Sequence, residues 1–411
     1  MNYTKVYTFL LCLIIFLVPS NLFLKFFESS AYVNGIFVDY LIPKLYLSDI
    51  PIILLLLTWG YKTLMAKKKP LAMAQLDSTT WGVIGLGVLL IIRQFFAPYP
   101  LAAIWYLLKL IEMIALGFFL VHHRQLLTKR PVLLSIVVTL IFQSFLAIYQ
   151  YISHSALFGY WFLGEPNLSN PIGLARLTIG GIEKVLPYGT TAHPNILGGT
   201  LAIYFLILLK TLKKPKMLVV ASFSLIGLLL TFSFSAWLTL ILGMIFWILY
   251  KYVNLLYPMR YIFFLIAFFT PLAIKHLAVV YSDSPSMVRR AYLQEAAVNM
   301  YIDNPLFGIG LNNFTAKVEE YTATREIVRF IQPVHNIFFL WIAETGIAGA
   351  FLLIGVCILI IRKRNSLQLP LRTSRFLLFS AVPIMVLDHY LLTQQTGLLL
   401  LVFLIGFNQE R

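Results

Sequence analysis

The stretch Val334–Gly349, with the sequence VHNIFFLWIAETGIAG, joins a polar segment to an apolar one. His335 and Asn336 stand at its start, and the apolar run that follows contains a single acid, Glu344. Before it, residues 281–333 form the longest polar segment of the chain. A histidine between a polar segment and an apolar helix predicts that the chemistry of the protein lies at this junction.

The composition of the chain indicates which solvent surrounds that helix. The chain has 411 residues, of which 60% are hydrophobic and 12% are charged, whereas soluble domains carry about 25% charged residues. Apolar runs near the roughly 20 residues that a spanning helix needs recur along the whole chain. We therefore predict an all-α integral membrane protein in which residues 1–411 form a single polytopic domain. About twelve spans are expected, at residues 7–24, 47–64, 81–98, 101–121, 131–152, 195–210, 217–232, 235–253, 261–280, 335–361, 374–390 and 393–408.

Basic residues are distributed unevenly between the expected loops. If the N-terminus is inside, the loops on that side carry eighteen basic residues and one acid; they are 62–79, 122–130, 210–216, 251–260 and 362–375. Loop 281–334, on the other side, carries five basic residues and six acids. Because loops rich in Lys and Arg stay in the cytoplasm, both termini are predicted to be cytoplasmic and loop 281–334 to be outside. This asymmetry accounts for the net charge of +16 without a nucleic-acid partner.

Two of the expected outer loops are long, about 153–193 and 281–334. The first is rich in Gly, Pro and Asn and is expected to be irregular, with room for one short helix. The second is extracytoplasmic and contains a helical stretch over residues 287–302, which Asn304-Pro305 ends. A stretch of alternating charges over residues 317–329 suits a short amphipathic helix on the membrane surface.

Polar groups at the ends of spans are functional candidates, because an unsatisfied polar group in a membrane is costly. Five such groups share the expected outer face. They are Tyr188–Asn195, Thr231–Ser235, Arg289-Arg290, His335-Asn336, and Asp388-His389-Tyr390 with Thr393, Gln394 and Gln395.

Structural roles would also explain these residues, and these alternatives stay open. His193 and Asn195 would cap the sixth span. The serines of the second group suit a turn, and the two arginines suit anchors that meet lipid phosphates. Glu344 suits an internal hydrogen bond that locks neighbouring helices. Adjacent side chains on a helix diverge, so Asp388 and His389 each need another partner.

Several of these residues belong to motifs with a characteristic spacing. Pro305–Gly310 reads PLFGIG, His335-Asn336 follows after a spacer, and Glu344-Thr345-Gly346 stands nine residues further on. The sequences GTTAHPNILGG at 189–199 and TFSFSAW at 231–237 accompany them, as do Asp303-Asn304 and Asp388-His389-Tyr390. With these motifs the chain resembles, over most of its length, the superfamily of O-antigen ligases and Wzy-type polysaccharide polymerases.

The resemblance implies an enzyme without a cofactor that uses a glycan carried on undecaprenyl diphosphate, at the outer face of the bacterial cytoplasmic membrane. It implies that His335 activates the acceptor hydroxyl and that outer arginines hold the diphosphate, with Arg290 in the expected place and Arg289 beside it. The other donor-binding candidates are His193, Asn195 and Lys184. The supporting candidates are Asn336, Glu344, Asp388, His389 and Tyr390.

The chain also departs from the family pattern at two positions. Leu186 and Phe234 stand where the family often has arginine. Lys184 and Arg176, in the first long loop, are candidate replacements for these two cations.

The chemistry of the residues supports the same mechanism independently of the resemblance. A diphosphate leaving group needs fixed positive charge, and guanidinium binds it through two parallel hydrogen bonds. An acceptor hydroxyl needs a base with a near-neutral pKa, which histidine supplies. The sequence shows no acidic metal cluster, so arginine rather than a metal ion is expected to stabilise the leaving group. Direct attack on the anomeric carbon would invert its configuration.

The sequence thus predicts a GT-C-like, metal-independent membrane glycosyltransferase. Its acceptor is a glycan end in a polymerase, or a lipid or protein in a ligase, and the sequence does not separate the two. One alternative is a twelve-span transporter or flippase of a lipid-linked glycan, which would place charges near the membrane midplane and show a duplicated hydropathy pattern. A second is a catalytically silent relative that only binds glycolipid, as Leu186 and Phe234 would suggest.

The same reasoning gives different roles to the two titratable residues of the opening stretch. In a straight helix Glu344 would lie about 13 Å below His335, at about 1.5 Å per residue. We therefore expect Glu344 to be a structural residue. The orienting partner of His335 is expected elsewhere, on the loop or at Asp388.

Overall fold

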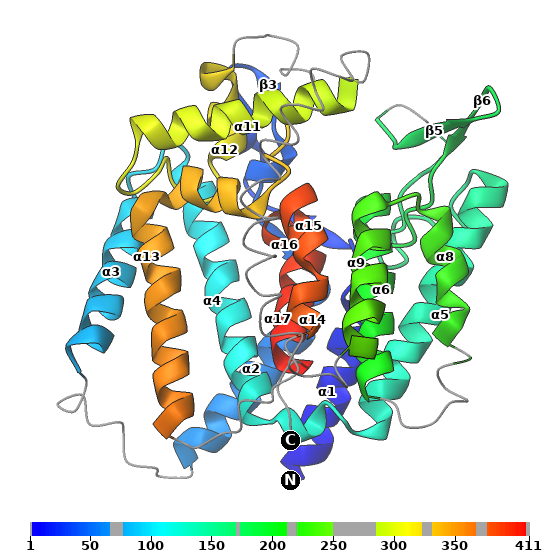
Figure 1. The fold of residues 1–411 in the computed structure, drawn as a ribbon, viewed down its shortest axis with the longest axis horizontal. Coiled ribbons are helices and arrows are strands. Elements are labelled where there is room, and N and C mark those ends of the chain that lie inside the picture. Colours follow the sequence, from blue (N-terminus) through cyan, green and yellow to red (C-terminus); the bar gives the residue numbers. More distant parts are fainter. Residues whose placement is uncertain are drawn as a thin grey trace.

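The computed structural model of the chain describes residues 2–65, 77–169, 173–211, 219, 221–249, 285–322, 331–366 and 376–407, and these form a bundle of helices (Figure 1). The first helices are α1 (Tyr3–Leu17), α2 (Asp49–Met65), α3 (Ser78–Gln94), α4 (Pro100–His122), α5 (Arg130–Ser153) and α6 (Pro194–Thr211). They are followed by α8 (Ser224–Leu230), α9 (Phe234–Leu249), α11 (Pro285–Asp303), α12 (Phe314–Lys317) and α13 (Ile337–Ser366). The last are α14 (Phe376–Ser380), α15 (Val382–Leu387), α16 (Tyr390–Thr393) and α17 (Gln395–Phe407).

Within the described residues, four helices are long and apolar enough to cross a membrane: α4, α5, α6 and the Ile337–Leu359 part of α13. Helix α4 shows how they meet their surroundings, because Leu108, Ile111, Ile114 and Phe118 form an exposed apolar stripe along it. Such a stripe is stable against lipid and costly in water. The chain is therefore a mostly helical, multi-pass membrane protein.

The expected count of about twelve spans is not confirmed. Several apolar helices are shorter than the roughly 20 residues that cross a bilayer, among them Tyr3–Leu17, Ser78–Gln94 and Gln395–Phe407. The eleventh expected run is divided between α14 and α15. The ninth, residues 261–280, lies outside the described residues.

Helix α6 forms the centre of the largest hydrophobic core, with residues 196–208 all buried. It packs against α5, α8, α9 and α17. Gly198 and Gly199 permit this packing, because a Cβ at Gly198 would meet the side chains of the 231–236 turn and one at Gly199 would meet the hydroxyl of Tyr390. Small residues commonly allow such close approach between membrane helices.

Helix α13 is broken at Gly346, whose backbone has φ 61° and ψ −163°. The PLFGIG segment docks against this break through main-chain hydrogen bonds. Ile347 N donates to Pro305 O over 2.8 Å, and Gly310 N donates to Glu344 O over 2.9 Å. The left-handed φ at Gly346 explains why glycine stands there. The two most specific sequence motifs therefore form one interlocked structure.

The break changes the expected position of Glu344. Figure 1 shows the turns of α13 before Gly346 lying across the end of the bundle, beneath α11, and the longer part after it running along the bundle. The expectation that Glu344 lies about 13 Å deeper than His335 assumed one straight helix. That assumption is wrong, because the helix turns at Gly346 just after Glu344.

Short strands and turns lie at the same end of the bundle as α11, which we call the α11 end. β1 (Phe23–Lys25) pairs with β4 (Lys44–Tyr46), and β2 (Tyr32–Val33) pairs with β3 (Ile36–Phe37), all antiparallel. Two 3₁₀ turns, η1 (Glu28–Ala31) and η2 (Asp39–Leu41), complete this N-terminal segment, which the sequence did not single out.

The first long loop contains an antiparallel hairpin of β5 (Arg176–Ile179) and β6 (Ile182–Val185). The expectation of an irregular loop with one short helix is wrong here, because Gly180 and Gly181 adopt positive φ and form the tight turn that a hairpin needs. In the second loop, α11 spans Pro285–Asp303, where a helix over 287–302 was expected. The expected surface helix over 317–329 begins as η6 (Val318–Tyr321), and residues 323–330 lie outside the described residues.

Candidate active site

Asp388 connects three of the five groups that the sequence singled out. It lies in the turn between α15 and α16 and is only 5% exposed. Its Oδ2 accepts hydrogen bonds from Asn195 Nδ2 over 3.1 Å and from Ser235 Oγ over 3.0 Å. Asn195 is in the first turn of α6 and Ser235 in the first turn of α9. The buried carboxylate therefore ties together the ends of two helices that are far apart in the sequence.

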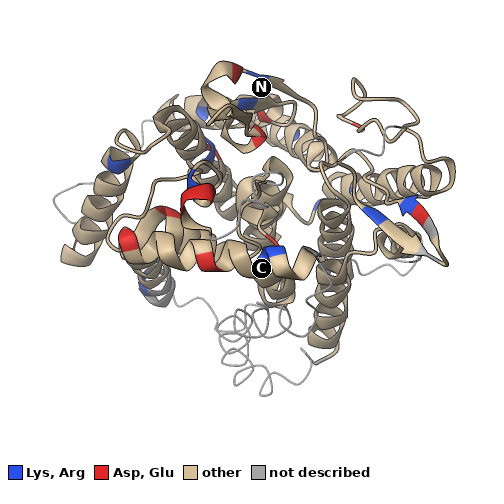
Figure 2. Ribbon diagram, turned by 90° about the horizontal axis from the view of Figure 1, so that it is seen from above, with Lys and Arg blue, Asp and Glu red and all other residues tan. Residues whose placement is uncertain are grey.

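Arg290 reaches the same turn from α11. Its Nη1 donates a 2.9 Å hydrogen bond to the carbonyl oxygen of Leu387, the residue before Asp388. Helix α11 lies across the bundle, and Figure 2 shows charged residues of both signs along it and around it. Arg290 thus places a guanidinium group beside the buried carboxylate of Asp388.

His335 lies two residues before the first residue of α13, and Asn336 between them caps this helix. Asn336 Oδ1 accepts from the backbone N–H of Phe338 over 2.9 Å and of Phe339 over 3.2 Å, which caps the helix. The ring of His335 stands edge-on to the ring of His389, with the centroids 5.0 Å apart. The Nδ1 atom of His335 is buried and has no hydrogen-bond partner among the described residues.

The ring of His389, in turn, has a hydrogen-bond partner. Its Nδ1 lies 2.7 Å from Thr393 Oγ1, one turn further along the chain. Asp388 bonds to Asn195 and Ser235 rather than to either histidine. The expected orienting contact between His335 and Asp388 is therefore absent from the described residues, and the ring of His389 occupies the place beside His335.

Burial and neighbouring groups favour the neutral form of His335, which lies before the membrane-spanning part of α13. Burial lowers the pKa of His335 well below its usual value. His389 and Arg290 lower this pKa further, with smaller contributions from His193 and Arg289. A neutral imidazole has a free lone pair that accepts a proton, and the positive field around it attracts an anionic ligand.

His193 and Tyr390 belong to the same cluster but have structural contacts. His193 Nδ1 accepts a 3.1 Å hydrogen bond from the backbone N–H of Asn195 and so caps α6. The other ring nitrogen of His193 is left for another partner. Tyr390 is buried against Gly199, and its hydroxyl has no hydrogen-bond partner among the described residues.

Glu344 and Lys184 make contacts outside this cluster. The oxygens of Glu344 accept from the backbone N–H of Asn312 over 2.9 Å and of Phe314 over 3.1 Å, so Glu344 holds the turn after PLFGIG. Lys184 is in the β5–β6 hairpin, with its ammonium group 5.0 Å from the centre of the Tyr151 ring. Arg176, in the same hairpin, pairs with Glu183 over 2.7 Å. Among the described contacts, none brings either candidate replacement cation to Asp388.

Sequence reasoning missed a charged cluster inside the bundle. Lys109 of α4 forms ion pairs with Asp49 of α2 and, over 3.2 Å, with Glu112. Gln395 Nε2 donates to Asp49 Oδ1 over 2.6 Å. The available signal was the occurrence of Lys109 and Glu112 within the apolar run 101–121, since ionisable residues inside a span are functional candidates.

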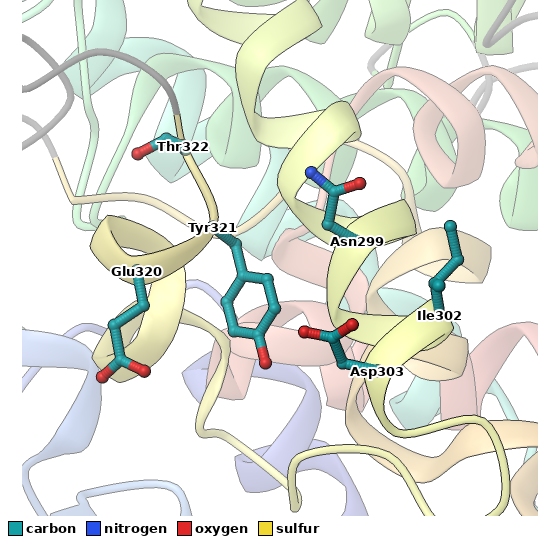
Figure 3. Close-up of a pocket in the computed structure, with 6 residues that line it drawn as sticks. All are labelled: Asn299, Ile302, Asp303, Glu320, Tyr321 and Thr322. Carbon is teal, nitrogen blue, oxygen red and sulfur yellow. The ribbon is translucent and has the colours of Figure 1, made fainter.

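Two of the hollows between the described residues lie near the α11 end. The larger, about 530 Å³, lies between the end of α11 and η6, where Tyr321 and Asp303 point toward each other (Figure 3). It is lined by none of the site residues that the sequence predicted. The smaller, about 50 Å³, is lined by Tyr40, Thr393 and Gln394 among others and adjoins the histidine pair. Among the described residues, no three His, Cys, Asp or Glu side chains are grouped so that they could hold a metal ion.

The comparisons with known proteins agree with the motifs. Residues 218–354 match the model of the O-antigen ligase (Wzy_C) family. This range includes Ser235, Arg290, His335 and the Gly346 break, whereas Asn195 and Asp388 lie outside it. No curated protein matches the chain. The match confirms the resemblance to the O-antigen ligase and Wzy-type superfamily over residues 218–354, so this multi-pass membrane protein carries an O-antigen ligase domain there, a domain of enzymes that transfer glycans.

Proposed function

We propose that the protein transfers a glycan from an undecaprenyl-diphosphate carrier to an acceptor hydroxyl, with His335 as the base and Arg290 and Arg289 as the diphosphate-binding residues. The observation that carries this proposal is the convergence of His335, Arg290 and Asp388 at one end of the bundle. A neutral imidazole and a guanidinium group side by side are the two parts that such a transfer needs.

His335 takes the proton of the acceptor hydroxyl in this mechanism. As the hydroxyl oxygen bonds to the anomeric carbon, the bond from that carbon to the diphosphate oxygen breaks, and the diphosphate leaves with the electron pair. The low pKa of His335, caused by burial and by neighbouring groups, keeps the ring neutral before the substrates arrive, and the negative charge of a bound diphosphate would raise this pKa toward the near-neutral range that a general base needs. Attack from the face opposite the leaving group inverts the anomeric configuration, and a product of retained configuration, found by NMR, would contradict this step.

Arg290 would hold the leaving diphosphate. One of its five N–H groups binds the Leu387 carbonyl, which fixes the guanidinium plane and leaves the others for phosphate oxygens. Arg289 adds to the positive field at His335. Two adjacent cations offset the charge that develops as the diphosphate departs, so they stabilise the transition state more than the ground state.

We place the α11 end at the outer face of the bacterial cytoplasmic membrane. The start of α1 and the end of α17 lie at the opposite end of the bundle in Figure 1, which agrees with two cytoplasmic termini. The uneven distribution of basic residues between the expected loops supports the same orientation. The acceptor is the end of a glycan, or a lipid or protein, so both polymerase and ligase activity are compatible with this site.

One observation favours the alternative of a transporter or flippase for lipid-linked glycan. Lys109, Asp49 and Glu112 form a charged cluster between helices of the bundle, which a transport pathway would use. Flipping of a fluorescent lipid-linked glycan across proteoliposome membranes, without glycan transfer, would support that alternative. Binding of the donor with neither flipping nor transfer would support a catalytically silent relative.

The proposed function is tested with two substitutions and a control. His335→Ala and Arg290→Ala should express normally and lose glycan transfer in vesicles supplied with a lipid-linked donor. Lys317→Ala is the matched control, because Lys317 is a cation of the same loop that pairs with Glu320 over 2.6 Å. Its activity should equal that of the wild type. Full activity of both test variants would exclude the proposed mechanism.

A further inference from the structure

The smaller cavity lies between the N-terminal segment, α4 and the turn that precedes α17. Its volume is about 50 Å³. The rings of Tyr40, Trp105 and Tyr106 line it, together with the amide groups of Asn312 and Gln394. Aromatic walls with a few fixed polar groups are the lining that small-molecule sites commonly have, but whole ligand pockets measure about 300–1,000 Å³, so this cavity has room for only part of a ligand.

This cavity adjoins His389, the histidine whose ring stands beside that of the proposed base. Thr393 lines the cavity and lies 2.7 Å from Nδ1 of His389. Tyr40, also in the wall, stands with its ring 5.9 Å from the ring of His389. The ring of His389 is in turn beside that of His335. His389 therefore separates the cavity from the turn that Arg290 and Asn195 contact.

Two side chains that belong to or contact the charged cluster inside the bundle, Lys109 and Gln395, line the cavity. Lys109 lines the cavity, and its ammonium group binds the carboxylates of Asp49 and Glu112. Gln395, another lining residue, is held by Asp49 over 2.6 Å and by Ser48 over 3.2 Å. An ammonium group has three N–H donors, so two carboxylates leave one for a ligand oxygen.

We propose that this cavity is the acceptor subsite and binds one edge of the sugar that carries the attacking hydroxyl. The inference rests on the proposed function. A volume of about 50 Å³ suits a hydroxymethyl arm and roughly one water molecule, given about 30 Å³ per water. The C–H face of a sugar packs on aromatic rings, and its hydroxyls bond to amide and ammonium groups. The acceptor in the cavity and the donor diphosphate at Arg290 then reach the site past opposite sides of His389, which allows the hydroxyl and the leaving diphosphate to lie on opposite faces of the anomeric carbon, as inversion requires.

Two cavity variants test this assignment. Gln394→Leu removes an amide while keeping its bulk, and Trp105→Ala removes an aromatic wall. The matched control is Trp161→Ala, because Trp161 is an 85% exposed tryptophan that does not line the cavity. Both cavity variants should raise KM for the acceptor about tenfold or more and leave KM for the donor unchanged, while the control should behave as the wild type.

The assay uses membrane vesicles from source cells whose own gene for this protein has been deleted and in which the wild type or a variant is expressed. Labelled lipid-linked glycan is the donor. Glycan transfer and release of undecaprenyl diphosphate by hydrolysis are measured separately. Methyl glycosides of common hexoses and N-acetylhexosamines are the binding probes. In the wild type at least one should inhibit transfer competitively with the acceptor and not with the donor, and both cavity variants should lose this inhibition.

The outcomes separate the two proposals. If His335→Ala is inactive while both cavity variants keep the acceptor KM of the wild type, the cavity assignment is wrong and the proposed function stands. An equal rise of both KM values in folded cavity variants would show a general distortion and would also overturn the assignment. Trp105→Phe, which keeps an aromatic wall, replaces Trp105→Ala if the latter fails to fold. It should raise the acceptor KM less than Gln394→Leu does.

Discussion

Replacement of Glu344 by alanine should loosen the turn after PLFGIG. The two oxygens of Glu344 accept from the backbone N–H groups of Asn312 and Phe314. Alanine leaves both donors without a partner, and an unsatisfied buried donor costs about 1–3 kcal/mol. The turn should therefore lose about 2–6 kcal/mol of local stability by the same estimate. Glu344→Gln should lose about half as much local stability. The amide oxygen of glutamine still accepts from one backbone N–H, whereas its NH₂ group cannot accept from the other.

Hydrogen exchange measures this loss directly. Amide protons in the turn exchange when the segment opens locally, so their rates report its local stability. A loss of about 2 kcal/mol corresponds to exchange roughly thirtyfold faster, at about 1.4 kcal/mol per factor of ten. Peptides that cover residues 306–322 should show this change in detergent-solubilised Glu344→Ala, with a smaller change in Glu344→Gln. Peptides from α6 should exchange as in the wild type.

Two outcomes of the exchange measurement would contradict the structural role of Glu344. Unchanged exchange at residues 306–322 in Glu344→Ala would show that the two hydrogen bonds do not hold the turn. Unchanged exchange combined with complete loss of glycan transfer would instead assign Glu344 a direct part in the chemistry. The His335→Ala variant serves as the reference, because it should lose transfer without any change in exchange at this turn.

Two further predictions concern the base and the break in α13. Because burial and nearby cations lower the pKa of His335, kcat/KM should stay flat as the pH falls through about 6.5, the usual histidine pKa, and should decrease only below it. Arg289→Gln removes a positive charge, so it should raise the pKa of His335 and move this acidic limb to higher pH. Gly346→Ala should destabilise the protein by about 2–6 kcal/mol, from about 1–3 kcal/mol of strain at positive φ and about 1–3 kcal/mol of overlap with the Leu306–Phe307 backbone. Thermal unfolding in detergent checks the last prediction, and Gly85→Ala, whose added Cβ would meet no atom within 4 Å, is its control.

Much of the neighbourhood of His335 could be predicted from the sequence. Polar residues at the ends of apolar runs marked Asn195, Ser235, Arg290 and Asp388, and the structure brings these four residues together. This succeeded because a membrane confines polar side chains to the ends of spans, so residues far apart in the chain share one face. Lys184 was selected for a different reason, as a replacement for the arginines that the family often has at the positions of Leu186 and Phe234, and its hairpin holds it beside Tyr151.

The sequence by itself determined the membrane setting, the helical class and the family, since these depend on composition and on short motifs. Only the tertiary structure decided that α13 turns at Gly346, that Asp388 binds Asn195 rather than His335, and that Lys109, paired with Asp49, lines a cavity. Hydropathy records how apolar a segment is and not which side chains meet across helices. Such contacts depend on the rotation and the breaks of each helix, which packing fixes in three dimensions.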